Sequence, residues 1–273
     1  MLLSQTVLDS VTTLVVEEPR PGIALITLDR PKQLNALTFA SFGELRRVVE
    51  ALEAHAATRV IVVTGRGRGF CSGLDLGDAA KLADMSVNQM LAEQKTWADG
   101  IASLRLTSIP VIAAVNGPAA GAGFGLALAA DIRLAARSAR FNAAFVRIGL
   151  SGGDVGVSWM LPRIVGLARA AEIMLTGRPY DADESARIGL VNAVHDDDEL
   201  LDAALDLATM IAGNSPLGMR LTKQVLQTNV DAPSLPAALE LENRNQVLAS
   251  RTEDMSEALA AFLERRVPRF NDR

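Results

Sequence analysis

The sequence predicts an α/β protein with a parallel sheet, followed by an all-helical C-terminal region. Two observations support this class. Over the first half of the chain, short apolar runs of buried-strand length alternate with segments of helical spacing, an order typical of βαβ units. From Asp154 onward, most segments carry helical spacing and capping residues instead.

The first half begins with a predicted hairpin, because two β-rich runs between residues 12 and 28 flank the turn signal Pro19-Arg20-Pro21-Gly22. Thr38 can then cap a helix that reaches about Ala54. The other elements expected here are a strand at 59–64, a helix at 95–106, a strand at 111–115, a helix at 121–130 and a strand at 132–136.

The last third is expected to be helical, with helices at 155–161, 167–175, 183–188, 198–212, 217–228, 236–249 and 253–266. We divide the chain into a core of residues 1–200 and a helical C-terminal region of residues 201–273. The final helices carry apolar positions such as Leu241, Leu259 and Phe262, which must pack on the core or on a neighbouring subunit. We therefore expect a homo-oligomer.

The composition excludes several classes of function. A formal net charge of -5 argues against a nucleic-acid partner, which would call for a basic surface. One cysteine and two histidines offer neither an internal disulfide nor a metal-ligand cluster. The opening segment lacks the features of a signal peptide, and no apolar run approaches membrane-spanning length. We expect a cytoplasmic protein without a membrane partner.

Two glycine-containing turns each follow a predicted buried strand. The first is the segment Phe70-Cys71-Ser72-Gly73-Leu74-Asp75-Leu76, and the second extends from Asn116 to Gly125. Strand ends are where open sheets place ligands, and N–H groups at the start of a helix attract anions. Each turn could donate hydrogen bonds to an oxyanion, although glycines can also serve only to make tight turns. Neither turn matches a nucleotide-binding fingerprint.

Taken together, these turns resemble the oxyanion-hole segments of the crotonase (enoyl-CoA hydratase/isomerase) family. Further segments match in the same order: RPKQLNAL at 30–37, PVIAAVNG at 110–117, LPRIVG at 161–166, AEIMLTGR at 171–178 and AFLERR at 261–266. The resemblance covers roughly residues 12 to 270. It implies a crotonase-like spiral of ββα turns, a helical C-terminal region that builds trimers, often paired into hexamers, and a CoA thioester substrate. CoA would be part of the substrate, and no separate cofactor is implied.

The resemblance also assigns site residues. The backbone N–H groups of Leu74 and Ala122 would polarise the thioester carbonyl and stabilise the enolate oxygen. The candidates for contact with CoA or the acyl group are Lys32, Leu34, Ser72, Gly73, Asp75, Leu76, Gly121, Gly125 and Phe145, with Arg66, Arg68, Phe262 and Arg265 as further candidates. Of these, Asp75 is expected to be structural and adjacent to CoA rather than catalytic.

The sequence departs from the hydratases of the family at two positions. Gly125 and Phe145 stand where those enzymes carry glutamates. Asp154 remains, seven residues before Leu161-Pro162, a spacing similar to that of ring-opening and dienoyl-CoA isomerases of the family. Asp154 is therefore the candidate proton-transfer group. The alternative is that its side chain only caps the helix expected at 155–161.

The surroundings expected for Asp154 are an apolar cleft formed by residues such as Phe124, Phe145 and Trp159, which would raise its pKa. With one carboxylate, double-bond isomerisation is the favoured reaction. An enoyl-CoA hydratase that uses Asp154 for both proton steps, through a bound water, is an alternative. Another is an acyl-CoA-binding protein that has lost the chemistry. A dehalogenase would also need a histidine that we cannot place.

Overall fold

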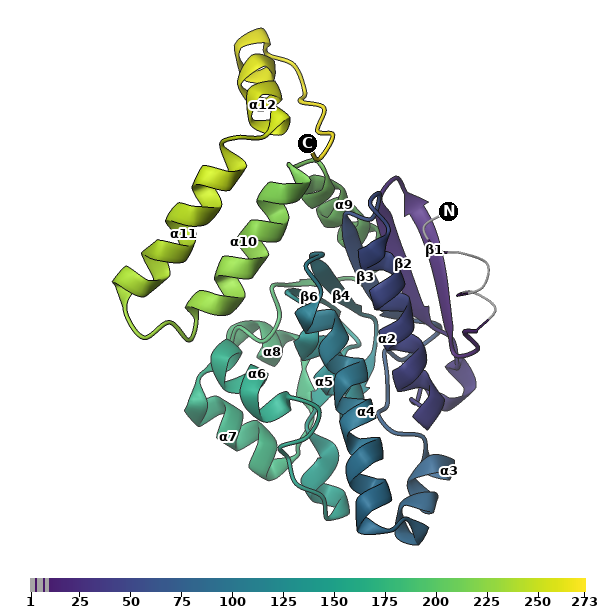
Figure 1. Cartoon of the computed structure of the whole chain (residues 1–273). Helices are drawn as coiled ribbons and strands as arrows, with labels where there is room; N and C mark the ends of the chain where they lie inside the picture. Colours follow the sequence, from purple (N-terminus) through teal and green to yellow (C-terminus); the bar gives the residue numbers. More distant parts are fainter. Residues whose placement is uncertain (1–2, 4–6, 8–9) are drawn as a thin grey trace.

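The computed structural model describes residues 3, 7 and 10–273, and a six-stranded sheet lies at its centre (Figure 1). The strand order is β1-β2-β3-β4-β6-β9. Its strands are β1 (Leu14–Arg20), β2 (Ile23–Leu28), β3 (Val60–Gly65), β4 (Val111–Val115), β6 (Ile132–Ala136) and β9 (Ala193–His195). The pair β1–β2 is antiparallel, and the other neighbours in this sheet are parallel. The predicted hairpin and parallel sheet are confirmed.

A second, three-stranded sheet has the order β5-β7-β8 and consists of β5 (Pro118–Ala120), β7 (Arg140–Asn142) and β8 (Tyr180–Asp181). The sequence analysis did not predict these strands or β9. They are two or three residues long, too short to show an alternating pattern. Strand β5 lies inside the turn that precedes the expected helix at 121–130, so this turn is a structured part of a sheet.

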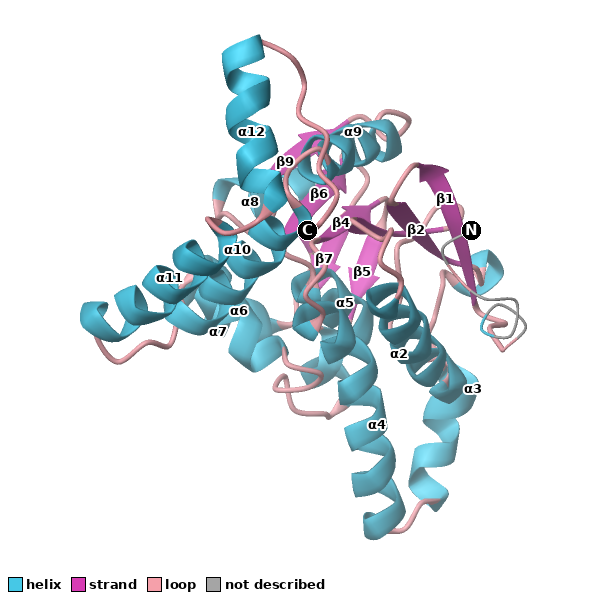
Figure 2. Ribbon diagram, turned by 45° about the horizontal axis from the view of Figure 1, so that its top comes forward, coloured by secondary structure: helices cyan, strands magenta, loops and turns pink. Residues whose placement is uncertain are grey.

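The larger sheet is covered on both faces (Figure 2). Along β2, Ala24 and Ile26 belong to the core shared with α2 (Phe39–Ala54), α4 (Val87–Leu106) and α5 (Ala122–Ala129). The alternate residues Ile23 and Leu25 belong to the core shared with α9 (Leu200–Ala212). This division follows from the two-residue period of a strand. Helix α9, which begins at the boundary expected at residue 200, therefore packs on the sheet.

Helix α4 begins eight residues before its predicted start at residue 95. Ser86 caps it by accepting a hydrogen bond from the Gln89 N–H, and the Gln89 side chain accepts one from the Ser86 N–H. This reciprocal pair is a capping box, and its S-x-x-Q pattern is present in the sequence. The turns of α4 before residue 95 carry Gln94, which contacts Asp154.

The helix expected at 155–161 is α6 (Val157–Val165), so its start was also placed wrongly. Gly156, with φ of 84°, occupies the N-cap position, and Val155 has φ of 40°. The remaining helices are α3 (Leu76–Ala79), α7 (Leu167–Thr176), α8 (Ala182–Arg187), α10 (Pro216–Asn229), α11 (Leu235–Ala249) and α12 (Glu253–Glu264). Short 3-10 helices lie at Pro31–Gln33, Ala80–Asp84 and Ala144–Ile148.

Helices α10, α11 and α12 extend from one side of the body (Figure 1). They expose large apolar side chains, including those of Leu226, Leu235, Val247, Leu248, Leu259 and Phe262. Within the part of the chain that the structure describes, no helix is both long and apolar enough to span a membrane.

Candidate active site

The loop that follows β3 is held by two asparagine side chains. Asn35, almost fully buried, donates from Nδ2 to the carbonyl oxygens of Arg66 and Gly69 at 3.0 and 2.7 Å. Asn116 donates from Nδ2 to the carbonyl oxygens of Gly65 and Gly67, both at 2.8 Å. These amides satisfy backbone carbonyls that the loop cannot pair internally. The RPKQLNAL and PVIAAVNG segments thus fix the entry to the first turn.

The Leu74 N–H is unpaired because the backbone hydrogen bonds of its turn are made by the residues on either side of it. Leu37 donates its N–H to the Gly73 carbonyl at 2.7 Å and accepts from the Asp75 N–H at 2.8 Å. In this parallel bridge Leu37 uses both of its backbone groups, whereas Leu74, the residue opposite, uses neither. Among residues 10–273 the Leu74 N–H has no acceptor.

The Ala122 N–H is unpaired because Ala122 is the first residue of α5. Gly121 precedes the helix with φ of 54° and donates its N–H to the Asn142 carbonyl at 3.0 Å. Gly125 donates to the Gly121 carbonyl at 3.1 Å and closes the first helical turn. The positive φ at Gly121 lets the chain turn sharply from β5 into the helix.

The two turns lie against each other. Cys71 donates its N–H to the Pro118 carbonyl and accepts from the Ala120 N–H, both at 3.0 Å. A Cβ added at Gly73 would lie 2.8 Å from the Ala120 carbonyl oxygen and 3.5 Å from the Ala122 nitrogen. Glycine is therefore required at position 73 for close approach as well as for its φ of 96°. Two unpaired N–H groups on adjacent turns can bind one oxygen anion.

Asp154 is partly buried and belongs to the loop before α6. Its Oδ1 accepts hydrogen bonds from the Val155 N–H at 2.8 Å and from Gln94 Nε2. Burial raises the pKa of this carboxyl, and the two hydrogen bonds partly oppose the rise. The expected direction of the pKa shift is confirmed. The capping alternative is wrong, because Gly156 is the N-cap of α6 and no side chain caps that helix.

Val155 fills the space beside Gly125. A Cβ added at Gly125 would lie 2.6 Å from Val155 Cγ2 and 3.5 Å from Val157 Cγ2. Val155 holds this place with φ of 40°, which is a strained conformation for a β-branched residue. Gly125, which the resemblance places at a glutamate position of the hydratases, thus lies under an apolar side chain, and Val155 links Asp154 to the helix that carries Ala122.

The apolar surroundings expected around Asp154 are present only in part. Phe124 and Phe145 are buried, and Phe145 Cε1 would lie 3.7 Å from a Cβ added at Gly121. Trp159 is instead 41% exposed, and its ring lies under the guanidinium of Arg163 at 4.0 Å. The expectation that Trp159 lines a cleft is therefore wrong for the isolated chain.

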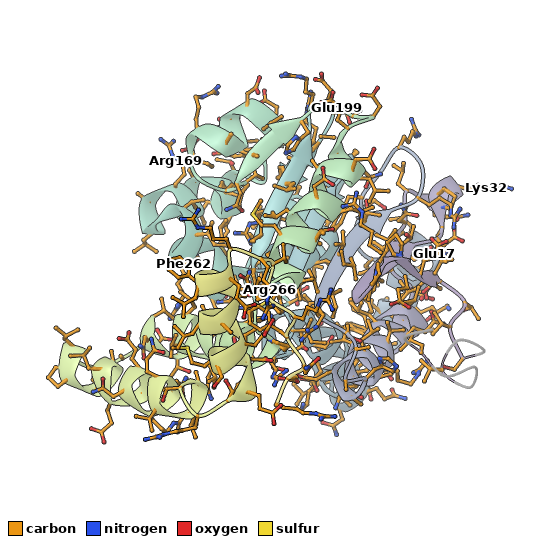
Figure 3. The ribbon with its side chains drawn as sticks, turned by 90° about the horizontal axis from the view of Figure 1, so that it is seen from above. Glu17, Lys32, Arg169, Glu199, Phe262 and Arg266 are labelled. Carbon is orange, nitrogen blue, oxygen red and sulfur yellow. The ribbon has the colours of Figure 1, made fainter. Side chains whose placement is uncertain are left out.

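The candidates for CoA contact around the first turn lie together. Ser72 donates its N–H to the Leu34 carbonyl at 3.0 Å and its hydroxyl to the Gln33 carbonyl at 3.2 Å. Lys32 precedes them on an exposed 3-10 turn at the edge of the molecule (Figure 3). A cavity of about 500 Å³ beside the Asn116-held loop is lined by Arg66 and Arg68, among others.

Two other candidates, Asp75 and Leu76, lie at the start of helix α3. Asp75 accepts from the N–H groups of Gly77 and Asp78 at the start of α3 and pairs with Arg30 at 2.9 Å, which lowers the pKa of its carboxyl. The interpretation of Asp75 as structural agrees with these contacts. Leu76, 86% exposed, begins the same helix.

Phe262 lies on α12, away from this group. Its side chain is 81% exposed, and Figure 3 shows it on the opposite side of the molecule from Lys32. One chain therefore does not bring Phe262, or its neighbour Arg265, to the turn that carries Lys32.

The sequence analysis did not identify Gln94. On α4, Met90, Trp97 and Ile101 lie four residues before, three after and seven after Gln94, and all three pack on the main core. Gln94 thus occupies the apolar stripe of its helix. A polar residue in such a stripe is a signal that the sequence contains, but its partner Asp154 lies 60 positions away and is visible only in the structure.

Comparisons with known proteins agree with the fold and the motifs. The profile of a family described as enoyl-CoA hydratase/isomerase matches residues 18–273. The probable enoyl-CoA hydratase EchA12 of Mycobacterium bovis is 43% identical over 268 residues, which cover 96% of this chain and 94% of that protein. The 1,2-epoxyphenylacetyl-CoA isomerase of Escherichia coli K12 is 36% identical over 257 residues, covering 94% and 97%.

The structure of an enoyl-CoA hydratase from Bacillus anthracis superposes with a TM-score of 0.91 at 32% identity, over 96% of this chain and 100% of that one. The spiral of short strands and helices is thus the crotonase fold. The chain belongs to the enoyl-CoA hydratase/isomerase family and is an acyl-CoA enzyme of that family.

Proposed function

We propose that this enzyme moves a double bond along an unsaturated acyl-CoA, with Asp154 as the proton-transfer group. The observation that carries the proposal is that only one of the three positions where the family can place a catalytic acid holds a carboxylate in this chain. Gly125 is covered by Val155, Phe145 is buried and apolar, and Asp154 is a partly buried carboxylate beside the same helix. One carboxylate suffices to remove a proton and return it to another carbon.

The proposed steps need no atom from outside the substrate. The Leu74 and Ala122 N–H groups bind the thioester oxygen, so charge that develops there is stabilised; losing one such donor typically costs about 2.7–4 kcal/mol. Asp154 takes a proton from carbon, and the electron pair of that C–H bond passes into a conjugated enolate. The proton then returns to the other end of the conjugated system, which shifts the double bond. A raised pKa suits Asp154 to both transfers.

The apolar contacts beside Asp154 favour isomerisation over hydration. Adding water requires a positioned water molecule and a proton donor, work that two carboxylates share in a hydratase. Here the space next to Gly125 holds Val155 Cγ2, which offers no hydrogen bond to a water. The E. coli relative is named as an isomerase of 1,2-epoxyphenylacetyl-CoA, so at least one relative is named for isomerising an acyl-CoA. Hydration through a water bound by Asp154 alone is the second candidate, supported by the relatives named as hydratases.

The test is an acyl-CoA screen in deuterated water with wild type, Asp154→Asn and Asp198→Asn. Asp198 is exposed and serves as the matched control. We expect exchange at the α or γ carbon in wild type and in Asp198→Asn, and a loss of about 10²–10⁴-fold in Asp154→Asn with acyl-CoA binding retained. A hydrated product would favour the hydratase. Tight binding in wild type with neither exchange nor a shifted double bond would overturn the proposal in favour of a non-catalytic acyl-CoA-binding protein.

We infer that CoA lies along the first turn. The exposed Lys32 and the cavity-lining Arg66 and Arg68 suit its phosphates. Leu34 and Leu76 would contact the rest of the CoA chain, with Ser72, Gly73 and Asp75 shaping the turn. Gly121, Gly125 and Phe145 would border the acyl group. The proposed chemistry calls for no cofactor besides the CoA of the substrate. Because its one cysteine cannot form an internal disulfide, we expect the enzyme to act in the cytoplasm.

We further propose a homotrimer or a dimer of trimers. Helices α10, α11 and α12 expose several large apolar side chains, and apolar side chains gathered on one part of a surface are typical of a protein–protein interface. Light scattering at micromolar concentration should give the mass of three or six chains. A monodisperse monomer would contradict the assignment of these helices as interface elements.

A further inference from the structure

The two carboxylate oxygens of Asp154 differ in their hydrogen bonding. Both hydrogen bonds to the carboxylate, from the Val155 N–H and from Gln94 Nε2, end on Oδ1. Oδ2 accepts no hydrogen bond from residues 10–273 and keeps some exposed surface. Oδ2 is therefore not fully buried and has no donor among these residues, whereas Oδ1 is occupied by two.

The Gln94 donor comes from a well-fixed helix. Trp97, one turn further along α4, is buried and stacks on Phe39 with ring centroids 4.7 Å apart and a 14° interplanar angle. Ile101, two turns along, is fully buried. Because these neighbours anchor α4, the direction from which Gln94 approaches Asp154 is set by the core.

We propose that Gln94 is a positioning residue, which together with the Val155 N–H holds Asp154 Oδ1 and leaves Oδ2 as the oxygen that exchanges protons with the substrate. This inference rests on the proposed proton transfer by Asp154. A carboxylate held by one donor can rotate about its Cβ–Cγ bond. A second donor on the same oxygen, from a different element, fixes the plane of the carboxylate.

Fixing the carboxylate matters because proton transfer needs the accepting oxygen within hydrogen-bond reach of the carbon. Small displacements of a reacting group are costly, on the order of 10²-fold in rate for about 1 Å. Gln94 also donates to the charged form of Asp154, which lowers its pKa against the effect of burial. The Val155 N–H acts in the same direction, and no charged side chain in the described residues contributes to this pKa.

The decisive variant is Gln94→Leu, which keeps much of the side-chain volume and removes the donor. We expect kcat to fall by about 10- to 100-fold with KM within about twofold. The acidic limb of the pH–rate profile should move to higher pH, because Asp154 loses a donor to its charged form. Gln94→Glu should move that limb further in the same direction, since it places a second carboxylate beside the first.

The matched control is Gln227→Leu. Gln227 also donates an amide hydrogen bond, from Nε2 to the Arg105 carbonyl at 2.6 Å, near the other end of α4. Its loss should leave kcat and the pH profile as in wild type. If Gln94→Leu changed neither quantity relative to Gln227→Leu, or changed only the melting temperature, Gln94 would be structural and the inference would be wrong.

The double variant Asp154→Asn/Gln94→Leu separates this inference from the proposed function. If Gln94 acts through Asp154, the double variant should be no slower than Asp154→Asn alone. Full additivity would overturn the positioning role. If Asp154→Asn itself retained wild-type exchange, the proposed function would fail first. If Asp154→Asn lost exchange while Gln94→Leu did not, only the role of Gln94 would be rejected.

Discussion

The two halves of the candidate site are built in different ways. The turns that carry the Leu74 and Ala122 N–H groups are fixed by backbone hydrogen bonds and by glycines that allow close contact, as at Gly73. Asp154 is held by one main-chain N–H, one side chain from another helix and a strained valine. In the proposed mechanism, oxyanion binding would therefore depend on the backbone, whereas proton transfer would depend on side chains that substitution can exchange. A fold of this kind can keep the first while it changes the second.

The largest expected effect of breaking the backbone half comes from Ala122→Pro. Proline is well tolerated at the first position of a helix, so this change removes the N–H without a large cost to α5. We expect kcat to fall by about 10²–10³-fold, the usual effect of losing an oxyanion donor. Steady-state kinetics with a check of folding by circular dichroism would measure it.

A matched control is Val87→Pro, at the first position of α4. Val87 is 84% exposed and follows the capping residue Ser86. This variant should keep wild-type turnover. Equal activity of the two proline variants would show that the Ala122 N–H binds no oxyanion.

A smaller effect is expected in the side-chain half, where Gly125 and Val155 should behave as one unit. Gly125→Ala adds a Cβ 2.6 Å from Val155 Cγ2, and such overpacking typically costs about 1–3 kcal/mol in the free energy of unfolding. Val155→Gly should remove both the clash and the strain at φ of 40°. Urea unfolding of the two single variants and the double variant forms a cycle. Additive effects would mean that the two residues do not compete for this space.

The smallest expected effect is on the pH dependence of stability. Because burial raises the pKa of Asp154 above its value of about 3.9 in the unfolded chain, the folded state binds the proton more tightly. The contribution of Asp154 to stability therefore falls as pH rises between the two pKa values, and stays low above them. Asp154→Asn should gain stability relative to wild type at pH 7, and this gain should shrink toward pH 4. A difference independent of pH would contradict the burial effect.

Much of the fold could be predicted because its central elements carry local signals. Strand β4 and β6 have the predicted bounds, and α2 begins after its predicted cap, Thr38. The short strands β5, β7, β8 and β9 exist only through pairing with distant segments, so no local pattern marks them. The start of α4 differs from these strands, because the sequence does contain a local signal for it. The S-x-x-Q pattern of Ser86 and Gln89 is a capping box that marks the first turn of the helix.

The candidate site also has parts that the sequence indicates locally and parts that depend on tertiary packing. The two glycine turns after buried strands are visible in the sequence, and the resemblance to the crotonase family is what assigns Leu74 and Ala122 within them. The hydrogen bond from Gln94 and the approach of Val155 to Gly125 depend on tertiary packing between residues 60 and 30 positions apart. Trp159 illustrates the opposite error, since an aromatic residue near the site in sequence lies at the surface under Arg163.

The packing of Val155 on Gly125 also restricts the order in which this active site could change. Any side chain at position 125, a glutamate included, starts with a Cβ that meets Val155 Cγ2 at 2.6 Å. A glutamate at 125 therefore displaces Val155 unless position 155 has first become smaller, and a smaller residue at 155 leaves unfilled the space beside Gly125. Single substitutions that lead from this arrangement to one with a second carboxylate at position 125 therefore pass through an intermediate that is less well packed than either end.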